Sequence, residues 1–332
     1  MGDFDVKLDI LFCGVCHTDV HYGKNDVGNT IYPIVPGHEM VGVVTEVGSK
    51  VTKFKVGDQA GIGCISDSCL DCSACEAGDE QYCLKGKSVH SYNDKKRYTH
   101  IGGNPDSQTF GGYSGSNVLH EHFLVKIPDG VPLEKAGPIM CAGTTMYDPL
   151  KHFGAVSGKK MTIGIVGIGG LGTMGIKLAR ALGHEVIAIS TSPSKKEMAF
   201  EKGAHKFIIS TDPSSLAEAK DSIDLILNTI SFEHDIGIYL SLLRYNGILV
   251  ELGLVTKPHA LNQMVLLRHR KGVFGSHIGG IKSTEECLEL CQKHGIAPDI
   301  EHITASKIQW AWDQLKENKD GLRYVIDIKK SL

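Results

Sequence analysis

The chain has 332 residues, 42% hydrophobic and 22% charged, which is typical of a globular protein large enough for two domains. A formal net charge of -3 provides no broad basic field, which argues against nucleic acid or an anionic membrane as a partner. The sequence shows no signal peptide, no apolar run of the ~20 residues that a membrane helix needs and no peroxisomal tripeptide, so we expect a cytoplasmic protein whose ten cysteines serve metal binding or burial.

The first predicted strand, residues 6–11, alternates apolar and polar side chains, and Gly14 predicts a turn after it. Residues 13–21 then crowd two thiols, two imidazoles, a hydroxyl and a carboxylate together. Taken alone, the C-x2-C pair in this stretch is half a zinc site, a redox pair or two packed cysteines, and packing is the favoured interpretation. The sequence around His38 and Glu39 is β-rich and broken by glycines, which indicates a β-barrel-like domain.

Four cysteines with the spacing C-x2-C-x2-C-x7-C are the strongest metal signal in the chain: Cys69, Cys72, Cys75 and Cys83. Four thiolates can close a tetrahedron around zinc and leave no position for water, so the sequence predicts a structural zinc lobe at about residues 64–84. Without a metal, four surface thiols are an oxidation liability. Cys64 lies outside the spacing and is expected in the core.

Residues 88–112 are rich in Gly, Asn, Asp, Ser and Lys and predict a long loop of the kind that often faces substrate. Its two histidines, His90 and His100, are expected to be solvated rather than to bind a metal.

A glycine-rich motif, G-I-G-G-L-G at residues 167–172, lies between a strand-like run at 161–166 and a helical pattern. Gly167 permits a tight turn, Gly169 lets backbone N–H groups approach a pyrophosphate, and Gly172 allows close packing. The motif is completed by Gly170 and Leu171.

Five further strand-like runs follow the motif, at residues 186–190, 206–209, 223–227, 247–252 and 272–274. Helical patterns lie between them, around residues 195–201, 216–219, 235–243 and 261–268. Six strands alternating with helices predict a doubly wound parallel sheet that binds a dinucleotide.

The end of the second strand of this sheet indicates which dinucleotide is bound. An NAD-binding chain usually presents Asp or Glu there, whereas this chain presents Thr191, Ser192, Lys195 and Lys196. Hydroxyl and ammonium groups suit a 2′-phosphate, which carries roughly -1.5 to -2 charges. We therefore predict NADP(H) rather than NAD(H); the alternative is that the two lysines only solvate the next helix.

Near the C-terminus, residues 283–294 predict an amphipathic helix and residues 324–328 a closing strand. Cys287 and Cys291 lie on the apolar face of the helix and are expected in the core.

Taken together, the motifs resemble the zinc-containing medium-chain alcohol dehydrogenases, most closely their cinnamyl alcohol dehydrogenase-like branch of NADP-dependent aldehyde reductases. The resemblance covers nearly the whole chain and rests on six motifs in the order of that family: residues 13–19, 36–39, 69–83, 141–145, 167–172 and 275–279. It implies an α/β fold made of a GroES-like catalytic domain with the zinc lobe, a Rossmann NADP-binding domain and a C-terminal return to the catalytic domain, at residues 1–143, 144–279 and 280–332. It also implies a homodimer joined through the cofactor domains.

The resemblance implies a catalytic zinc ion held by Cys16, His38 and Cys141, with Glu39 as an alternative ligand and an open position for substrate oxygen. With the structural lobe, this gives two zinc ions per chain. Zinc lowers the pKa of bound water from ~15.7 to ~7, and the same Lewis acidity stabilises an alkoxide or polarises an aldehyde. Cys13 then becomes a packing residue.

The resemblance also assigns the route of the alcohol proton, through Thr18 and the cofactor ribose, with His21 and Ser192 further along. Asp19 would orient the ring of His38. His17 would approach the cofactor pyrophosphate, and Ser276 joins the cofactor-binding residues. The alternatives are a helix-capping Thr18 and a merely surface-exposed His21.

This chain departs from the plant cinnamyl enzymes in two respects. His90 and His277 stand where those enzymes place bulky aromatic pocket residues, so we expect a broad aldehyde reductase acting on primary alcohol and aldehyde pairs. The chain also begins about one β-hairpin later, which would leave a barrel edge exposed or differently covered. A catalytically impaired NADP-binding protein of the same fold is the alternative function.

Overall fold

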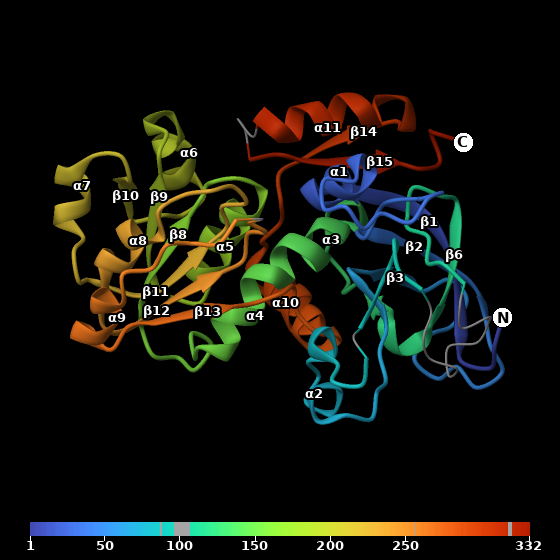
Figure 1. Cartoon of the computed structure of the whole chain (residues 1–332). Coiled ribbons are helices and arrows are strands. Elements are labelled where there is room, and N and C mark those ends of the chain that lie inside the picture. Colours follow the sequence, from blue (N-terminus) through green and yellow to red (C-terminus); the bar gives the residue numbers. More distant parts are fainter. Residues whose placement is uncertain (87, 96–106, 256, 318–320) are drawn as a thin grey trace. The chain divides into compact units, whose positions relative to one another are not determined.

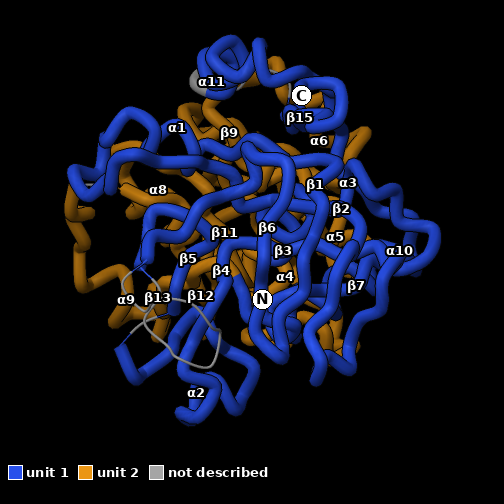
Figure 2. The backbone as a smooth tube through the Cα atoms, turned by 90° about the vertical axis from the view of Figure 1, so that its right-hand side faces the viewer, with its two compact units in different colours: residues 1–144, 279–332 blue, residues 145–278 orange. Residues whose placement is uncertain are grey.

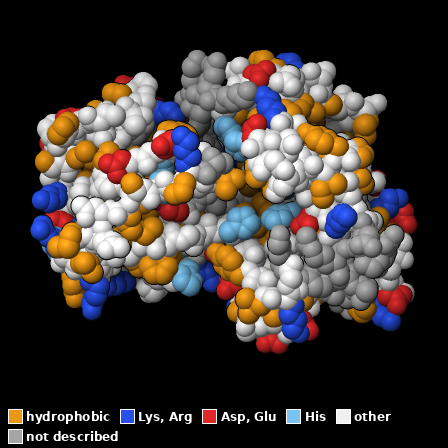
Figure 3. All heavy atoms as spheres, viewed as in Figure 1, with side chains coloured by type: hydrophobic (Ala, Val, Ile, Leu, Met, Phe, Trp, Pro, Cys, Tyr) orange, Lys and Arg blue, Asp and Glu red, His pale blue; other side chains and the backbone are white. Residues whose placement is uncertain are grey.

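The computed structural model describes residues 1–86, 88–95, 107–255, 257–317 and 321–332. The chain divides into two compact units (Figure 2). Unit 1 comprises residues 1–144 and 279–332, and unit 2 comprises residues 145–278. Among the helices of the described ranges, none is both long and apolar enough to cross a membrane. On the face drawn in Figure 3, basic and acidic side chains are interspersed rather than gathered by sign.

Unit 1 is built on a mixed sheet with the order β14-β15-β1-β2-β3-β7, in which β6 also pairs with β1 (Figure 1). Its strands are β1 (Asp5–Val15), β2 (Met40–Val47), β3 (Gln59–Ile62), β6 (Ser116–His120), β7 (Val125–Lys126), β14 (Ile300–Ile303) and β15 (Arg323–Asp327). A separate pair is formed by β4 (Ile65–Asp67) and β5 (Val89–His90). β1 pairs with β15, β2 and β6. The first residues of β15 and of β2 therefore lie close to the C-terminal end of β1.

The helices of unit 1 are α1 (His17–Lys24), α2 (Ser73–Glu76), α3 (Leu133–Pro138), α10 (Ile281–His294) and α11 (Ile308–Glu317). A π-helical turn at Ile139–Gly143 leads into α4 (Thr144–His152), and short 3-10 turns lie at Glu80–Tyr82, Glu121–Phe123 and Ala305–Lys307. Cys287 and Cys291 of α10 are 0% and 1% exposed, which confirms their predicted place in the core. The sequence patterns did not predict α11 or β14.

The predicted turn at Gly14 is wrong, because β1 continues without a break to Val15. Gly14 donates its N–H to the carbonyl of Glu39 at 3.1 Å. A Cβ on Gly14 would lie only 1.9 Å from Glu39 Oε2. The glycine is thus required by a buried side chain on the neighbouring segment, not by a change of chain direction.

Part of the predicted loop at residues 88–112 is structured, since Val89 and His90 form β5. The remaining described part contributes an isolated bridge between Lys95 and Gln108. His100 lies outside the described residues.

Unit 2 contains a six-stranded sheet with the order β10-β9-β8-β11-β12-β13, in which every neighbouring pair is parallel. Its strands are β8 (Thr162–Val166), β9 (Glu185–Ser190), β10 (Lys206–Ile209), β11 (Ile223–Asn228), β12 (Leu243–Glu251) and β13 (Gly272–Gly275). This confirms the predicted doubly wound sheet. The strands read as near-continuous apolar runs because helices cover both faces of such a sheet.

The helices of unit 2 after α4 are α5 (Gly170–Ala181), α6 (Lys196–Glu201), α7 (Pro213–Glu218), α8 (Ile236–Leu242) and α9 (Gln263–His269), with a 3-10 turn at Pro193–Lys195. In Figure 1, α5 packs on β8 and β9, and α8 and α9 lie along β12. Doubly wound sheets bind ligands at the carboxyl ends of their strands, where the strand order reverses; here that point lies between β8 and β11.

Candidate active site and metal centres

Four potential metal ligands from three distant segments converge in unit 1: Cys16, His38, Glu39 and Cys141. All four are buried, and one ligand atom of each lies within 4.8 Å of the others. Cys16 follows the end of β1, and His38 and Glu39 precede the start of β2. Because β1 and β2 are antiparallel, with Cys13 opposite Met40, the end of one strand meets the start of the other. Cys141 is supplied by the π-helical turn.

The spacing of these atoms fits a zinc ion. Cys16 Sγ and Cys141 Sγ are 3.9 Å apart, and Cys141 Sγ is 3.3 Å from His38 Nε2. Tetrahedral zinc with Zn–S bonds of about 2.3 Å and Zn–N bonds of about 2.0–2.1 Å separates two sulfurs by about 3.8 Å, and sulfur from nitrogen by about 3.6 Å. Three such ligands leave a fourth position open, as in catalytic rather than structural zinc sites.

The electrostatics of the cluster also favour a cation. A hydrogen bond from Cys141 and the charge of His38 hold the pKa of Cys16 well below its usual value. The same hydrogen bond raises the pKa of Cys141 well above its usual value. Burial lowers the pKa of His38, but the negative charges of neighbouring groups, chiefly Cys64 and Asp19, outweigh burial and raise it. The lowered pKa of Cys16 therefore favours its thiolate, whose negative charge a metal ion would neutralise.

Glu39 is fully buried and forms an ion pair with Arg323 of β15, which is also buried. Its Oε1 accepts a hydrogen bond from Arg323 Nη2, whereas Oε2 is buried without a hydrogen-bond partner among the described residues. Burial raises the pKa of Glu39, although the charge of Arg323 opposes this. A carboxylate with one oxygen paired and the other unpaired beside the cysteines is suited to be an alternative metal ligand.

Asp19 connects the parts of this cluster, and its side chain is 0% exposed. Its Oδ1 lies 3.3 Å from His38 Nδ1 and accepts the N–H of Gly37 at 3.1 Å. Its Oδ2 accepts the N–H of Cys16 at 2.9 Å and the hydroxyl of Tyr113 at 3.2 Å. The carboxylate thus directs Nε2 of His38 toward Cys141, which is the geometry that an orienting role requires.

We expect the substitution Asp19→Ala to weaken zinc binding at this cluster by about 10–100-fold, because His38 loses the group that fixes its ring. The zinc retained per chain during competition with a chelator measures the change. Asp9→Ala removes an exposed carboxylate from β1 and serves as the control. Equal retention in the two variants would contradict the role of Asp19.

The proton-path candidates lie on α1, directly after Cys16. Thr18 is exposed, and its Oγ1 is 3.8 Å from Cys16 Sγ. Cys16, not Thr18, occupies the N-cap of α1, so the capping alternative does not apply. His21 lies one turn further, with Nδ1 3.1 Å from Asp26 and a side chain 30% exposed, and its ring centroid is 5.5 Å from that of His17. A hydroxyl beside the cluster and a half-exposed imidazole therefore follow one another on the same helix.

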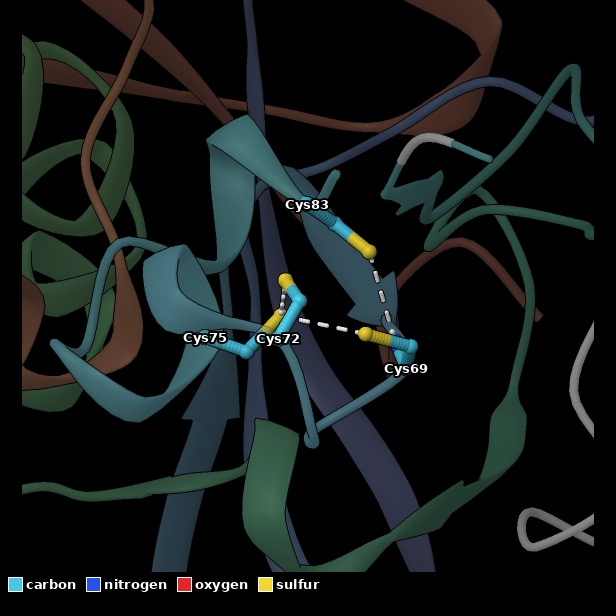
Figure 4. A group of neighbouring side chains, drawn as sticks. All are labelled: Cys69, Cys72, Cys75 and Cys83. Carbon is cyan, nitrogen blue, oxygen red and sulfur yellow. Dashed lines mark hydrogen bonds between the residues drawn. The ribbon is translucent and has the colours of Figure 1, made fainter. Parts of the chain in front are cut away.

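The second cluster contains four cysteines of unit 1, shown in Figure 4: Cys69, Cys72, Cys75 and Cys83. Their sulfurs lie within 4.8 Å of one another, with 3.5 Å between Cys72 and Cys75 and 3.8 Å between Cys69 and Cys75. The backbone N–H groups of Cys75 and Leu84 lower the pKa of Cys72 to about 6, which favours its thiolate. Four thiol ligands at these distances fit a closed zinc site.

In unit 2, the glycine motif has the geometry that a dinucleotide needs. Gly167 has a φ of +85°, which only glycine adopts readily. A Cβ on Gly172 would lie 1.9 Å from the carbonyl oxygen of Gly167, so helix and loop can approach each other only because Gly172 has no side chain. Gly169 occupies the N-cap of α5, and Gly170 and Leu171 begin the helix. The free N–H groups at the N-terminus of α5 and the dipole of this helix favour a phosphate there.

Next to the glycine motif, the turn after β9 presents hydroxyl and ammonium groups. Lys195 Nζ donates to the carbonyl of Ile168 at 2.8 Å, so this side chain reaches the glycine loop rather than only solvating α6. Ser192 and Ser194 share a hydrogen bond of 2.8 Å, Thr191 precedes them, and Lys196 begins α6. After β13, Ser276 Oγ is buried without a hydrogen-bond partner among the described residues, as expected of a group that meets a ligand.

Two residues near the first cluster were not found by sequence reasoning. Cys64 was expected in the core, but it is only half-buried, and a hydrogen bond with Cys141 lowers its pKa. Arg323 lies one residue before the predicted closing strand and received no role, although a charged residue directly before the apolar run Tyr324–Ile326 could have indicated a buried partner. Of the two expected pocket histidines, His90 is 40% exposed beside Asp94 and His277 is exposed.

Comparison with known proteins agrees with this geometry. Residues 2–129 match the family described as the alcohol dehydrogenase GroES-like domain, and residues 170–327 match the zinc-binding dehydrogenase family. NADP-dependent alcohol dehydrogenase C 1 of Mycolicibacterium smegmatis is 45% identical over 98% of this chain and 91% of that relative.

Two solved structures are also similar. A cinnamyl alcohol dehydrogenase of Sorghum bicolor superposes with a TM-score of 0.94 and 38% identity, over 100% of this chain and 92% of that one. The Helicobacter pylori CAD, solved with NADP(H), gives a TM-score of 0.89 and 37% identity with the same coverage. The two family matches and the relative that is 45% identical over 98% of the chain show the family, and the two cysteine-containing clusters agree with it. The chain therefore belongs to the zinc-binding alcohol dehydrogenases.

Proposed function

We propose that this alcohol dehydrogenase uses NADP(H) to interconvert primary alcohols and aldehydes, with a broad range of aldehydes as substrates. The observation that carries the proposal is the buried cluster of Cys16, His38 and Cys141, whose spacing fits three zinc ligands with one position left open. Similarity to relatives named NADP-dependent alcohol dehydrogenase and cinnamyl alcohol dehydrogenase supports the reaction class.

Zinc at this cluster would supply the Lewis acidity that polarises a substrate oxygen. The residues of the chain would bind this ion, orient its ligands and move the alcohol proton. Cys16, His38 and Cys141 would hold the ion, and Asp19, 3.3 Å from His38 Nδ1, would fix the ring of His38. Thr18, whose hydroxyl lies beside Cys16, would pass the alcohol proton on, and His21 would exchange it with solvent next to Asp26. The four-cysteine lobe would hold a second, structural zinc.

We expect Thr18→Val to lower kcat by about 10²–10⁴-fold, because valine keeps the shape of threonine but cannot relay a proton. Zinc content should stay at the wild-type value, since Thr18 is not a ligand. Adding Val20→Thr to Thr18→Val would test whether a hydroxyl elsewhere on the same helix compensates. Wild-type turnover in Thr18→Val would remove Thr18 from the mechanism.

The turn formed by Thr191, Ser192, Lys195 and Lys196 supports NADP(H), since it lacks the carboxylate that NAD-binding chains present. The glycine motif would bind the pyrophosphate of the same cofactor, and Ser276 follows the carboxyl end of β13.

Ser192→Asp is expected to lower kcat/KM for NADPH by about 10–100-fold, because it places a negative charge where the 2′-phosphate would bind. The value for NADH should change little. Ser306→Asp adds the same charge to an exposed position of unit 1 and is the control. A wild-type preference for NADH would refute the cofactor assignment.

An NADPH oxidation assay across aliphatic, aromatic and cinnamyl aldehydes tests the substrate proposal. With His90 and His277 in place of aromatic residues, we expect comparable kcat/KM values for medium-length aliphatic aldehydes and for cinnamaldehyde. A sharp preference for cinnamaldehyde would contradict the broad range.

We also propose a cytoplasmic homodimer joined through unit 2. In the described residues, β13 lies at the edge of its sheet and pairs only with β12. Large apolar side chains are exposed on or near this edge: Leu254, Leu261, Met264, Leu267 and Phe274. An open strand edge beside exposed apolar residues favours association with a second copy, which light scattering of the purified chain can detect.

A further inference from the structure

We propose that unit 2 contains a third metal site, formed by His234, Glu251 and His259, for a divalent transition-metal ion such as Zn²⁺. One potential ligand atom from each residue lies within 4.8 Å of the other two. His234 lies in the loop after β11, Glu251 is the last residue of β12, and His259 lies in the loop after β12. The ligands of both zinc clusters described above belong to unit 1, so this site is separate from them.

The ring of His234 is held in the orientation that metal binding requires. Its Nδ1 lies 2.6 Å from the carbonyl oxygen of Phe232, which can only accept a hydrogen bond. Nδ1 therefore carries the proton, and Nε2 of the neutral ring has a free lone pair. A histidine that ligates a metal usually donates its second ring N–H to a carbonyl or carboxylate in this way.

The lone pairs of His234 and Glu251 are directed at one position. The side-chain amide nitrogen of Asn228 occupies that position. Asn228 is fully buried, and its Nδ2 lies 2.7 Å from His234 Nε2 and 3.0 Å from Glu251 Oε2. A single amide nitrogen thus donates to both acceptors. A cation close to this position would replace the two amide protons as the partner of both groups.

Two further observations indicate a missing cationic partner. Glu251 Oε1 is buried and has no hydrogen-bond partner among the described residues. A buried carboxylate oxygen without a partner is rare, because the loss of hydration is not compensated. The second observation concerns the other oxygen, Glu251 Oε2. It accepts a hydrogen bond from the neutral amide of Asn228 and lies 4.0 Å from the imidazole of His259.

His259 supplies the third ligand. Its ring packs edge-on against that of His234, with centroids 4.9 Å apart, and its Nε2 lies 4.0 Å from Glu251 Oε2. Ligand atoms with bonds of about 2.1 Å at tetrahedral angles are about 3.4 Å apart. To reach this spacing, His259 Nε2 has to move by roughly half an ångström toward Glu251.

Two imidazoles and one carboxylate form a ligand set known for zinc, with a fourth position for water. Imidazole nitrogen selects zinc and its transition-metal neighbours over magnesium and calcium, which prefer all-oxygen sites. An ion here would join the loops that follow two adjacent parallel strands. It would stabilise the carboxyl edge of the sheet, where doubly wound folds bind their ligands.

The test is equilibrium dialysis of the full chain, as purified with its bound metal, against increasing Zn²⁺, with added zinc per chain measured by elemental mass spectrometry. We expect the wild type to take up one additional ion and His259→Gln to bind it at least tenfold more weakly. The matched control is His269→Gln, which changes a histidine of the same unit that pairs with Asp221. It should bind the additional ion like the wild type. Counting added ions keeps the result separate from the unit 1 sites.

A second measurement follows thermal unfolding with and without Zn²⁺. The ion should raise the Tm of the wild type and of His269→Gln, but not that of His259→Gln. Should His259→Gln fail to fold, Glu251→Gln takes its place, since glutamine keeps the shape of the side chain. The proposal is overturned if the wild type takes up no additional ion, if the cluster variant binds it with wild-type affinity, or if His269→Gln loses it equally.

Discussion

Replacing Cys141 by alanine is expected to reduce kcat/KM for aldehyde reduction by about a thousandfold or more, equivalent to about 4 kcal/mol of transition-state stabilisation. Cys141 Sγ lies 3.9 Å from Cys16 Sγ and 3.3 Å from His38 Nε2, so its loss leaves only two ligands in the three-ligand set. Metal analysis should show one zinc per chain instead of two, because the four-cysteine lobe is separate in sequence and keeps its own ion.

Cys291→Ala provides the matched control for this prediction. It removes a thiol that is 1% exposed in α10, outside both cysteine clusters. We expect it to retain two zinc ions and wild-type kcat/KM, with only the stability loss of a small cavity. If Cys141→Ala kept its activity, or if the control lost a zinc ion, the assignment of the open metal site to the first cluster would be wrong.

Replacing Cys72 by alanine is expected to lower the stability of unit 1 by about 3 kcal/mol and its Tm by about 6–12 °C. Apart from its cysteines, the lobe contributes few apolar side chains to a core, and Cys72, Cys75 and Cys83 pack mainly on one another. Zinc binding must therefore supply most of the free energy that orders the lobe. Calorimetry of the variant and of the wild type treated with a chelator should give similar shifts.

Lys85→Ala is the control in the same lobe. Lys85 forms an exposed ion pair with Asp71 at 2.6 Å, and exposed pairs contribute about 0–1 kcal/mol. We expect this variant to keep its zinc and to unfold within about 4 °C of the wild type. A Cys72→Ala protein that unfolds at the wild-type temperature would show that the metal does not stabilise the lobe.

Much of unit 2 could be predicted from the sequence because its signals are local. Each buried parallel strand is a short apolar run, and each run is bounded by turn residues, so periodicity and spacing suffice to place it. The glycine motif is equally local, since a positive φ at Gly167 and the close approach at Gly172 depend on residues within six positions. The cysteine lobe spans only Cys69 to Cys83, and its ligand spacing alone indicates a closed site.

The first cluster could not be derived in this way. Cys16 and Cys141 are 125 positions apart, and no spacing rule links them; only the resemblance to a known family brought them together in advance. In the structure they meet because antiparallel pairing of β1 with β2 brings Cys16 to His38, and the π-helical turn adds Cys141. Long-range register of this kind depends on the packing of the whole sheet.

Local sequence thus suffices to specify the six-stranded dinucleotide-binding fold, the glycine turn and the four-cysteine lobe, because neighbouring residues fix their geometry. Which groups are buried together depends instead on the packing of distant segments. In the folded chain, Arg323 forms an ion pair with Glu39, and the side chain of Glu39 occupies the space beside Gly14. His234, Glu251 and His259 likewise meet at the carboxyl end of the unit 2 sheet. A buried charge needs a partner, and the fold, not the local sequence, determines which residue that partner is.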